Sequence, residues 1–461
     1  MRFSELDGLA VGVWGLGREV RSFVAKLAEH LPRARISVVV REDPEEDASD
    51  LERGGAQVVR ADEAVAALSR CDVIVRSPGV SIHRRELVEL ARADIRTATP
   101  TGLWLSERGG RRVIGVTGTK GKSTTATIIA HLAATAGHRV HLAGNIGRPA
   151  LELLDVPEAD WAVIELSSYQ IADLRCGPEV AVMTNLYKDH VNWHGSDPVY
   201  RAEKLRLLAL PRVATCVLPA GNADIAAADH GEARVMLYDV AGAWHVTPEG
   251  IHDGARLRIP FSALPLRGPH NAVNVCAALT AIQAAGLSLP ALPDGLTALQ
   301  PLPHRLETVR NTHGVEWVDD SISTTPESTI AALASFPDRL VILLGGGQDR
   351  DQDYSELAKI AVDRRLLLLG LPTTGSRLVS AARAAGVRAE RAVEVADMAE
   401  AVALAHRLAR PGTIVLLSPA APSYNAYRNF EERGAHFRAL ARLDHPPSLT
   451  LRSAGARFTI S

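Results

Sequence analysis

Three times along the chain, a short apolar run rich in β-branched residues leads through a glycine-containing turn into a stretch with helical spacing. This order is typical of parallel α/β units, in which each strand is followed by a covering helix. Strands are expected at 9–14, 36–40 and 73–75, then at 113–116, 161–166 and 180–183, and finally at 316–318, 340–344, 366–369 and 413–417, with a helix at 124–136. The pattern therefore predicts an α/β protein.

The three series of strands indicate three domains. A chain of 461 residues with 46% apolar side chains is long enough for two or three hydrophobic cores. The first series ends near Glu107, and the proline-rich Gln300-Pro301-Leu302-Pro303 precedes the third. We therefore predict domains at 1–107, 108–303 and 304–461.

Composition narrows the choice of partners. A formal net charge of −2 and scattered basic residues argue against nucleic acid. Four cysteines without C-x-x-C spacing indicate neither a zinc site nor a disulfide framework and fit a reduced compartment. Neither a signal peptide nor a run of about 18 apolar residues is recognisable, so we expect no membrane insertion and a cytoplasmic location.

The most specific local motif is a glycine- and lysine-containing loop between a predicted buried strand and a predicted helix. Such a turn leaves backbone N–H groups free to point at phosphate oxygens, next to the positive end of the helix dipole. Lys122 would reach the β- and γ-phosphates, and the Ser123 hydroxyl would coordinate Mg²⁺. The predicted ATP-binding loop comprises Gly118, Thr119, Lys120, Gly121, Lys122, Ser123 and Thr124. By itself, the loop predicts a nucleotide but no particular reaction.

A second glycine-rich turn, Gly12 to Gly17, follows the first predicted strand. It is similar to a dinucleotide-binding fingerprint, but Val20 occupies the position of the third glycine. A nicotinamide oxidoreductase is one interpretation. Strand–helix packing, or binding of another nucleotide-like group, is favoured over it.

Two further residues of the middle region are candidate metal ligands. Glu165 ends a predicted strand, at the edge where open α/β sheets bind ligands, and could contact a divalent metal. An ordinary surface role at a strand end is the alternative. His190 is the second candidate ligand. A lone histidine more often has a structural role, so both roles stay open for it.

Several motifs follow one another along the chain: Val116 to Thr124, Gly144-Asn145-Ile146-Gly147, Glu165-Leu166-Ser167-Ser168, Asp189-His190, Lys204, Pro269-His270-Asn271, His304-Arg305 and Asp320-Ser321. Taken together, these ordered motifs resemble those of the Mur ligases. The resemblance implies a Rossmann-like N-terminal domain for a UDP-sugar, a central P-loop ATPase domain with a parallel sheet, and a Rossmann-like C-terminal domain. It also implies a cytoplasmic ligase of peptidoglycan synthesis that adds glutamate to UDP-N-acetylmuramoyl-L-alanine through an acyl phosphate. We expect a monomer.

The resemblance also implies roles for individual residues. Lys122, His190 and Lys204 would be catalytic. Ser123 and Glu165 would hold one Mg²⁺, and His190 a second, supported by Lys204 if that lysine is carbamylated; an unmodified Lys204 on a solvated helix face is the alternative. Asn271, Arg305 and Asp320 would bind ATP. The UDP-sugar would contact Leu16, Gly17, Ser77, Pro78, Gly79 and Asn145.

The chain departs from the common pattern near the implied glutamate site, whose residues are Thr324, Arg350, Ser423 and Phe430. The enzymes that add D-glutamate carry a lysine where this chain has Ile322. If both enantiomers of glutamate are bound through the same amine, they present their carboxylates to different sides of the binding site. Loss of one cation there could therefore change the stereochemical preference. We therefore expect L-glutamate, with a separate epimerase acting downstream.

Other functions remain open. D-glutamate is the alternative substrate, and a folylpolyglutamate synthase is a more distant one, disfavoured because a complete domain precedes the ATP loop. A non-catalytic Mur-ligase-like subunit would carry a cysteine-rich insertion, which the four isolated cysteines do not supply. An ATP-driven motor or kinase is excluded only if amide formation is observed.

Overall fold

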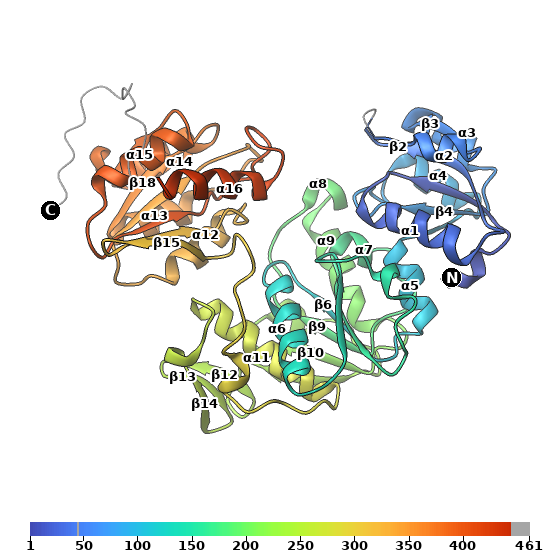
Figure 1. The fold of residues 1–461 in the computed structure, drawn as a ribbon, viewed down its shortest axis with the longest axis horizontal. Helices are drawn as coiled ribbons and strands as arrows, with labels where there is room; N and C mark the ends of the chain where they lie inside the picture. Colours follow the sequence, from blue (N-terminus) through green and yellow to red (C-terminus); the bar gives the residue numbers. More distant parts are fainter. Residues whose placement is uncertain (44–45, 444–461) are drawn as a thin grey trace. The chain divides into compact units, whose positions relative to one another are not determined.

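The computed structural model describes residues 1–43 and 46–443 (Figure 1). Within that part the chain forms two compact units. Unit 1 comprises Met1–Leu264 and Ala272–Leu299, and unit 2 comprises Pro265–Asn271 and the chain from Gln300 onward. Each contains at least one wholly or largely parallel sheet together with helices, so the predicted α/β class is confirmed. The predicted domain boundaries at 107 and 303 stay predictions.

Unit 1 begins with a five-stranded parallel sheet in the order β3-β2-β1-β4-β5. Its strands are β1 (Ala10–Trp14), β2 (Arg35–Arg41), β3 (Gln57–Arg60), β4 (Val73–Arg76) and β5 (Arg96–Ala98). The accompanying helices are α1 (Arg18–His30), α2 (Ser49–Arg53), α3 (Ala64–Leu68), α4 (Arg85–Arg92) and α5 (Pro100–Arg108), with short 3₁₀ turns η1 (Phe3–Leu6) and η2 (Ala61–Glu63). The order reverses at β1 and β4, the usual place for a ligand in such sheets.

The central sheet of unit 1 has six parallel strands in the order β11-β10-β9-β6-β8-β7. They are β6 (Val113–Thr117), β7 (Val140–Gly144), β8 (Trp161–Glu165), β9 (Val180–Met183), β10 (Thr215–Pro219) and β11 (Arg234–Tyr238). The helices are α6 (Lys122–Thr135), α7 (Ser168–Ile171), α8 (Val191–His194), α9 (Asp197–Leu205) and α10 (Ala223–Ala226), with η3 (Ala150–Leu153) and η4 (Arg206–Ala209). The carboxyl ends of β6, β7, β8 and β9 therefore lie along one edge.

A small antiparallel sheet follows in the chain. It comprises β12 (Trp244–Thr247), β13 (Gly250–Asp253) and β14 (Arg256–Pro260), and η5 (Phe261–Ala263) comes after it. Helix α11 (Pro269–Ala284) begins in a segment assigned to unit 2 and continues in unit 1. The 3₁₀ turn η6 (Asp294–Leu296) is the last element of unit 1. The sequence pattern did not predict this sheet.

Unit 2 contains a six-stranded sheet in the order β15-β16-β20-β17-β18-β19, parallel except for the pair β15 and β16. The strands are β15 (Glu307–Thr312), β16 (Val315–Asp319), β17 (Val341–Gly345), β18 (Leu366–Gly370), β19 (Ala392–Glu394) and β20 (Ile414–Leu417). The helices are α12 (Pro326–Ala334), α13 (Ser355–Asp363), α14 (Gly375–Ala384), α15 (Met398–Leu408) and α16 (Phe430–Ala441), with η7 (Ala389–Arg391). The continuous apolar runs of β17, β18 and β20 are buried along their whole length, as expected for strands covered on both faces.

Every strand predicted from the sequence is present within a few residues of its expected bounds, as is the helix expected at 124–136. Continuous apolar runs in the sequence predicted these strands, because strands covered on both faces carry apolar side chains on both sides. Among the described residues, the structure contains no helix with the length and apolar character needed to cross a membrane.

One hydrophobic cluster joins the first two sheets. It includes Val11 and Val13 of β1, Val113 of β6, and the fully buried Leu103 and Trp104 of α5. Because α5 contributes to the packing of both sheets, the two parts of unit 1 should lose stability together.

We expect Trp104→Ala to destabilise unit 1 by about 3–5 kcal/mol, because the side chain is 1% exposed and its loss leaves a cavity in the shared cluster. Hydrogen exchange followed by mass spectrometry should show faster exchange in peptides from both β1 and β6. The exposed Val88→Ala is the control, with a change within about 0.5 kcal/mol. Faster exchange in one sheet alone would contradict a shared cluster.

Candidate active site

The loop between β6 and α6 has a backbone that only glycine fits at two positions. Gly118 has φ +143°, and a Cβ there would lie 1.8 Å from Thr184 Oγ1. Gly121 has φ +81°, and its Cβ would lie 2.5 Å from Asn274 Oδ1. Gly121 directly precedes α6, whose first-turn N–H groups have no partner within the helix and suit an anion.

Neighbouring groups hold the loop in place. Asn185 accepts from the backbone N–H of Thr119 at 3.0 Å through its carbonyl and from that of Lys120 at 2.8 Å through Oδ1. Lys122 Nζ donates to the Thr119 carbonyl oxygen at 3.0 Å, so its ammonium group lies over the loop. In the first turn of α6, Ser123 is buried and Thr124 is half-buried. The loop thus has the form of a preassembled phosphate cradle.

Glu165 ends β8 at the same edge of the sheet, opposite Val116 of β6. Its side chain is 1% exposed, and Oε1 accepts from Asn145 Nδ2 at 2.8 Å. The other oxygen, Oε2, is buried without a hydrogen-bond partner within residues 1–43 and 46–443. A buried carboxylate oxygen is costly to leave unpaired, so the site fits a cation at Oε2.

His190 precedes α8 with a left-handed backbone at φ +52°. Its Nδ1 is 2.7 Å from the hydroxyl oxygen of Tyr169. Desolvation lowers the pKa of the imidazole and the nearby Lys122 cation adds to this, although solvent reduces the effect because 40% of the side chain is exposed. If Nδ1–H donates to Tyr169, Nε2 carries the lone pair that a metal would use.

Lys204 lies in α9 and is 1% exposed, which excludes a solvated helix face. Its Nζ donates to the Gly118 carbonyl oxygen at 2.9 Å and lies 5.1 Å from the centre of the Tyr200 ring. Burial lowers the pKa of the amine well below its usual range, and the Lys122 cation acts in the same direction. The neutral amine is therefore strongly favoured relative to an exposed lysine.

These groups converge on the phosphate loop. Lys204 interacts electrostatically with Lys122, Glu165 and Asp189, and Asp189 Oδ2 lies 3.4 Å from Lys120 Nζ. Three of the predicted site residues, Lys122, Glu165 and Lys204, thus share one electrostatic environment although 82 residues separate the first from the last in the chain.

The predicted UDP-sugar loops follow β1 and β4, which are neighbours in the first sheet. A Cβ on Gly17 would lie 2.8 Å from Ser77 Oγ, so the two loops are in close contact. The N–H of Leu16 donates to Glu46 Oε1 at 3.0 Å. The structure therefore brings Leu16, Gly17 and the Ser77-Pro78-Gly79 loop to one place, at the switch point of the sheet. Asn145, the remaining residue predicted for this substrate, lies beside Glu165, and its carbonyl oxygen accepts from Nη2 of Arg18, the residue after Gly17, at 3.0 Å.

Arg76 organises this loop, and sequence patterns did not reveal it. The side chain is fully buried, and Nη1 donates to the carbonyl oxygens of Ser77, Pro78 and Val80 at 3.4, 3.3 and 2.9 Å. Nε pairs with Asp173 at 2.9 Å, and Nη2 donates to the Tyr169 carbonyl at 2.8 Å. One guanidinium group thus connects the predicted UDP loop to the segment that contacts His190.

The remaining residues predicted to bind ATP, Asn271, Arg305 and Asp320, belong to unit 2. Asn271 Nδ2 donates to the Arg267 carbonyl at 2.6 Å. Asp320 is 4% exposed, accepting from Ser418 Oγ at 2.8 Å and from the Leu306 N–H at 3.3 Å. Burial raises the pKa of this carboxyl group to about 7. Its contacts are internal to unit 2, and its predicted contact with ribose stays a prediction.

The four predicted glutamate-binding residues lie on three loops and one helix start of unit 2. Thr324 is half-buried, Ser423 is buried, and Phe430 begins α16. Arg350 is exposed, with its guanidinium carbon 5.9 Å from the centre of the Tyr424 ring.

Arg433, another residue that the sequence did not single out, ties two of these loops together. Its Nε and Nη2 donate to Ser321 Oγ and O at 3.0 and 2.8 Å, and Nη1 donates to the Ala421 carbonyl at 2.9 Å. Burial lowers the pKa of this guanidinium to about 10. A buried cation on α16 therefore holds the loop that carries Ile322 to the loop that carries Ser423.

A phosphate cradle beside a buried carboxylate, an imidazole and a buried amine defines a nucleotide-dependent enzyme, and comparison with known proteins defines its class. The chain matches the Mur ligase middle domain over residues 116–282 and the glutamate ligase domain of the Mur ligases over residues 304–421. It is 38% identical to the UDP-N-acetylmuramoyl-L-alanine–L-glutamate ligase of Xanthomonas euvesicatoria pv. vesicatoria over 457 residues, which cover 96% of this chain and 97% of that protein. The enzyme of the same name from a Micromonospora species is 38% identical over 459 residues, 96% of this chain and 98% of that protein.

Solved structures show the same fold. The MurF ligase of Thermotoga maritima, solved in complex with ADP, aligns with a TM-score of 0.57 at 16% identity, covering 95% of this chain and 96% of that one. UDP-N-acetylmuramate-alanine ligase MurC from the same organism gives 0.57 at 15% identity, with 93% and 98% covered. The chain belongs to the Mur ligase family, the ATP-dependent ligases of peptidoglycan synthesis, and the predicted family and fold are confirmed.

We expect Gly118→Ala to weaken binding of an ATP analogue at least about tenfold, or ~1.4 kcal/mol, because the added Cβ meets Thr184 and the backbone is left-handed. Isothermal titration calorimetry measures the affinity. Gly221→Ala, where a Cβ meets nothing within 4 Å, is the matched control and should bind normally. Equal affinities in the two variants would show that the loop is not the nucleotide site.

Proposed function

We propose that this chain catalyses the ATP-dependent joining of L-glutamate to UDP-N-acetylmuramoyl-L-alanine, releasing ADP and phosphate. The observation that carries the proposal is the convergence of Lys122, Glu165 and Lys204 on the loop between β6 and α6. Relatives that align over 96% of the chain and are named for this reaction support it.

An amide forms in water only from an activated acyl group. The alanyl carboxylate oxygen attacks the γ-phosphorus of ATP, the bond to the bridging oxygen breaks, and ADP leaves, giving an acyl phosphate. Lys122 and the N–H groups at the start of α6 counter the negative charge of both reactants. The glutamate amine then attacks the acyl carbon and loses a proton, and phosphate leaves. Asn145, whose amide is fixed on Glu165, orients the acceptor.

The residues present fit two Mg²⁺ ions. Ser123 and the buried Oε2 of Glu165 would hold one, and Nε2 of His190 would hold the other. Bound there, Mg²⁺ would offset phosphate charge that the protein cations leave uncompensated.

Lys204 would support the second ion as a carbamate. A neutral amine adds CO₂ and releases one proton, so the neutral side chain becomes an anion whose two oxygen atoms can bind a metal ion. Burial and the Lys122 cation favour the neutral amine that this step requires. The carbamate nitrogen keeps an N–H, so the hydrogen bond to the Gly118 carbonyl can persist.

L-glutamate is preferred over D-glutamate because of Ile322, which lies near the proposed glutamate site. This half-buried apolar side chain occupies the place where the D-adding enzymes carry a lysine, so it offers no charge to a substrate carboxylate. Arg350 is then the exposed cation among the residues proposed for glutamate. A downstream epimerase, the monomeric state and the cytoplasmic location stay predictions.

We expect purified protein with ATP, Mg²⁺ and UDP-N-acetylmuramoyl-L-alanine to release phosphate at least about tenfold faster with L-glutamate than with D-glutamate, since one lost charged contact is worth ~1.4 kcal/mol or more. Mass spectrometry identifies the amide product. Lys122→Ala should lower turnover by about 10²-fold or more, whereas the exposed Lys188→Ala should not. Equal or faster turnover with D-glutamate would overturn the stereochemical assignment, and phosphate release without the amide would overturn the reaction.

Carbamylation of Lys204 can be tested without turnover. Protein equilibrated with ¹³C-bicarbonate should give a carbamate carbon resonance in NMR that Lys204→Met lacks and Lys188→Met retains. Lys188 is exposed and serves as the matched control. A wild-type spectrum with no resonance of this kind would leave Lys204 unmodified.

A further inference from the structure

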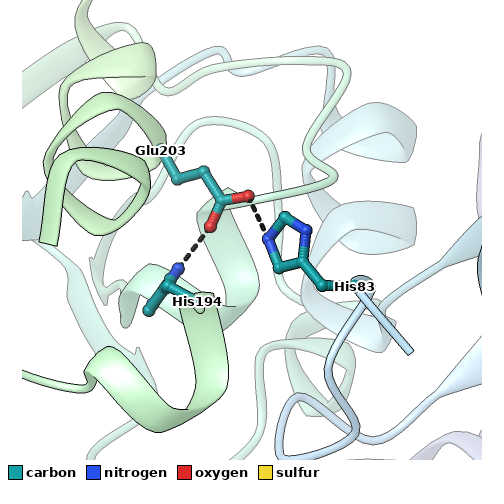
Figure 2. A group of neighbouring side chains, drawn as sticks. All are labelled: His83, His194 and Glu203. Atoms are coloured by element: carbon teal, nitrogen blue, oxygen red, sulfur yellow. Dashed lines mark hydrogen bonds and ion pairs between the residues drawn. The ribbon is translucent and has the colours of Figure 1, made fainter. Parts of the chain in front are cut away.

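Three potential metal ligands meet outside the proposed catalytic centre. His83 lies between β4 and α4, His194 ends α8, and Glu203 lies in α9. Figure 2 shows the Glu203 carboxylate between the two imidazole rings. His83 Nε2 is 2.7 Å from Glu203 Oε1, and His194 Nδ1 contacts Glu203 Oε2. The two ring nitrogens and one carboxylate oxygen all lie within 4.8 Å of one another.

The rings are already oriented for a shared ligand. His194 Nε2 is 3.0 Å from the buried Ser168 Oγ, which fixes the ring with Nδ1 toward Glu203. His83 packs edge-on against Trp193 with ring centres 5.9 Å apart. The contact between His194 and Ser168 is of the kind that usually holds a metal-bound histidine at its second ring nitrogen.

We propose that His83, His194 and Glu203 form a binding site for a transition-metal ion such as Zn²⁺, separate from the Mg²⁺ positions of the ligase reaction. Two imidazole nitrogens and one carboxylate oxygen form the ligand set of many zinc sites and leave a fourth position for water. A site with two imidazole ligands on one ion favours Zn²⁺ or Co²⁺ over Mg²⁺, which prefers a shell made mostly of oxygen.

Little movement is needed to bind the ion. Tetrahedral zinc with bonds of about 2.0–2.1 Å places its ligand atoms roughly 3.4 Å apart. The His194 side chain is fully buried and Glu203 is 13% exposed, so these two ligands are fixed. His83 is 40% exposed on a loop, so it can adjust by roughly an ångström and leaves a path for the ion to enter.

The ion would cross-link two segments that already touch. Ser81 Oγ donates to the Trp193 carbonyl at 2.7 Å, and Trp193 Nε1 donates to the Gly79 carbonyl at 3.0 Å. Gly79 belongs to the predicted UDP loop, and Glu203 adjoins Lys204. A metal bound here would therefore hold the loop after β4 to α8 and α9, and would stabilise unit 1 by mass action.

Cobalt is a direct probe of this site. The full-length chain, stripped of transition metals and saturated with Mg²⁺ and ADP to occupy the oxygen-rich positions, is titrated with Co²⁺. We expect one equivalent to give the intense visible absorption of four-coordinate Co²⁺, with a rise in melting temperature, and Zn²⁺ to displace it. His83→Gln retains a donor for Glu203 but removes the ring nitrogen, and should weaken binding at least tenfold.

The matched control is His30→Gln. Among the described residues, Glu29, His30 and Asp155 form the other group of three potential ligands, and all three are exposed. His30→Gln should bind Co²⁺ as the wild type does. Absence of the absorption in the wild type, its persistence in His83→Gln, or its loss in His30→Gln would each overturn the proposal. Anomalous diffraction from zinc-soaked crystals should place the ion between the three side chains, and a peak found only elsewhere would also overturn it.

Discussion

The buried amine of Lys204, bonded to the carbonyl oxygen of Gly118 at 2.9 Å, connects the helix α9 to the loop that follows β6. Burial of a long basic side chain is costly unless its charge is compensated or lost. The Lys204 side chain is 1% exposed, and Gly118 has no space for a Cβ against Thr184. The phosphate loop, the metal-binding candidates and the amine are therefore positioned together by packing around one lysine.

A second constraint joins the first sheet to the central sheet. Arg76 is fully buried and donates to backbone carbonyls on both sides of the contact, to the loop 77–80 and to Tyr169. Tyr169 in turn contacts His190 and stacks on Trp193 with ring centres 4.6 Å apart. The predicted UDP loop, the proposed metal ligand His190 and the His83–His194–Glu203 cluster thus share one set of contacts. We therefore expect a change at any of them to reach the others.

Much of the fold could be predicted from the sequence, because buried parallel strands read as short apolar runs. The runs that became β6, β8, β17 and β18 gave their strands within a residue or two. The antiparallel sheet β12–β14 was missed because most side chains of its strands are only half-buried or exposed, so these strands carry no such run. Among site residues, the glycines, Lys122 and Glu165 stood out because each adjoins a strand end. Arg76 and Arg433 did not, since an isolated arginine has the same appearance in a sequence whether it is buried or exposed.

The sequence by itself determined the order of the α/β units, the phosphate loop and the family, because these depend on local spacing along the chain. Only the tertiary structure decided that Lys204 is buried against Gly118 and that His83 meets His194 and Glu203. It also decided that one oxygen of Glu165 has no hydrogen-bond partner in the part of the chain that the structure describes. Those facts depend on contacts between segments up to 120 residues apart, such as His83 and Glu203. The desolvation that shifts the Lys204 amine toward its neutral form likewise exists only once the surrounding chain has excluded water.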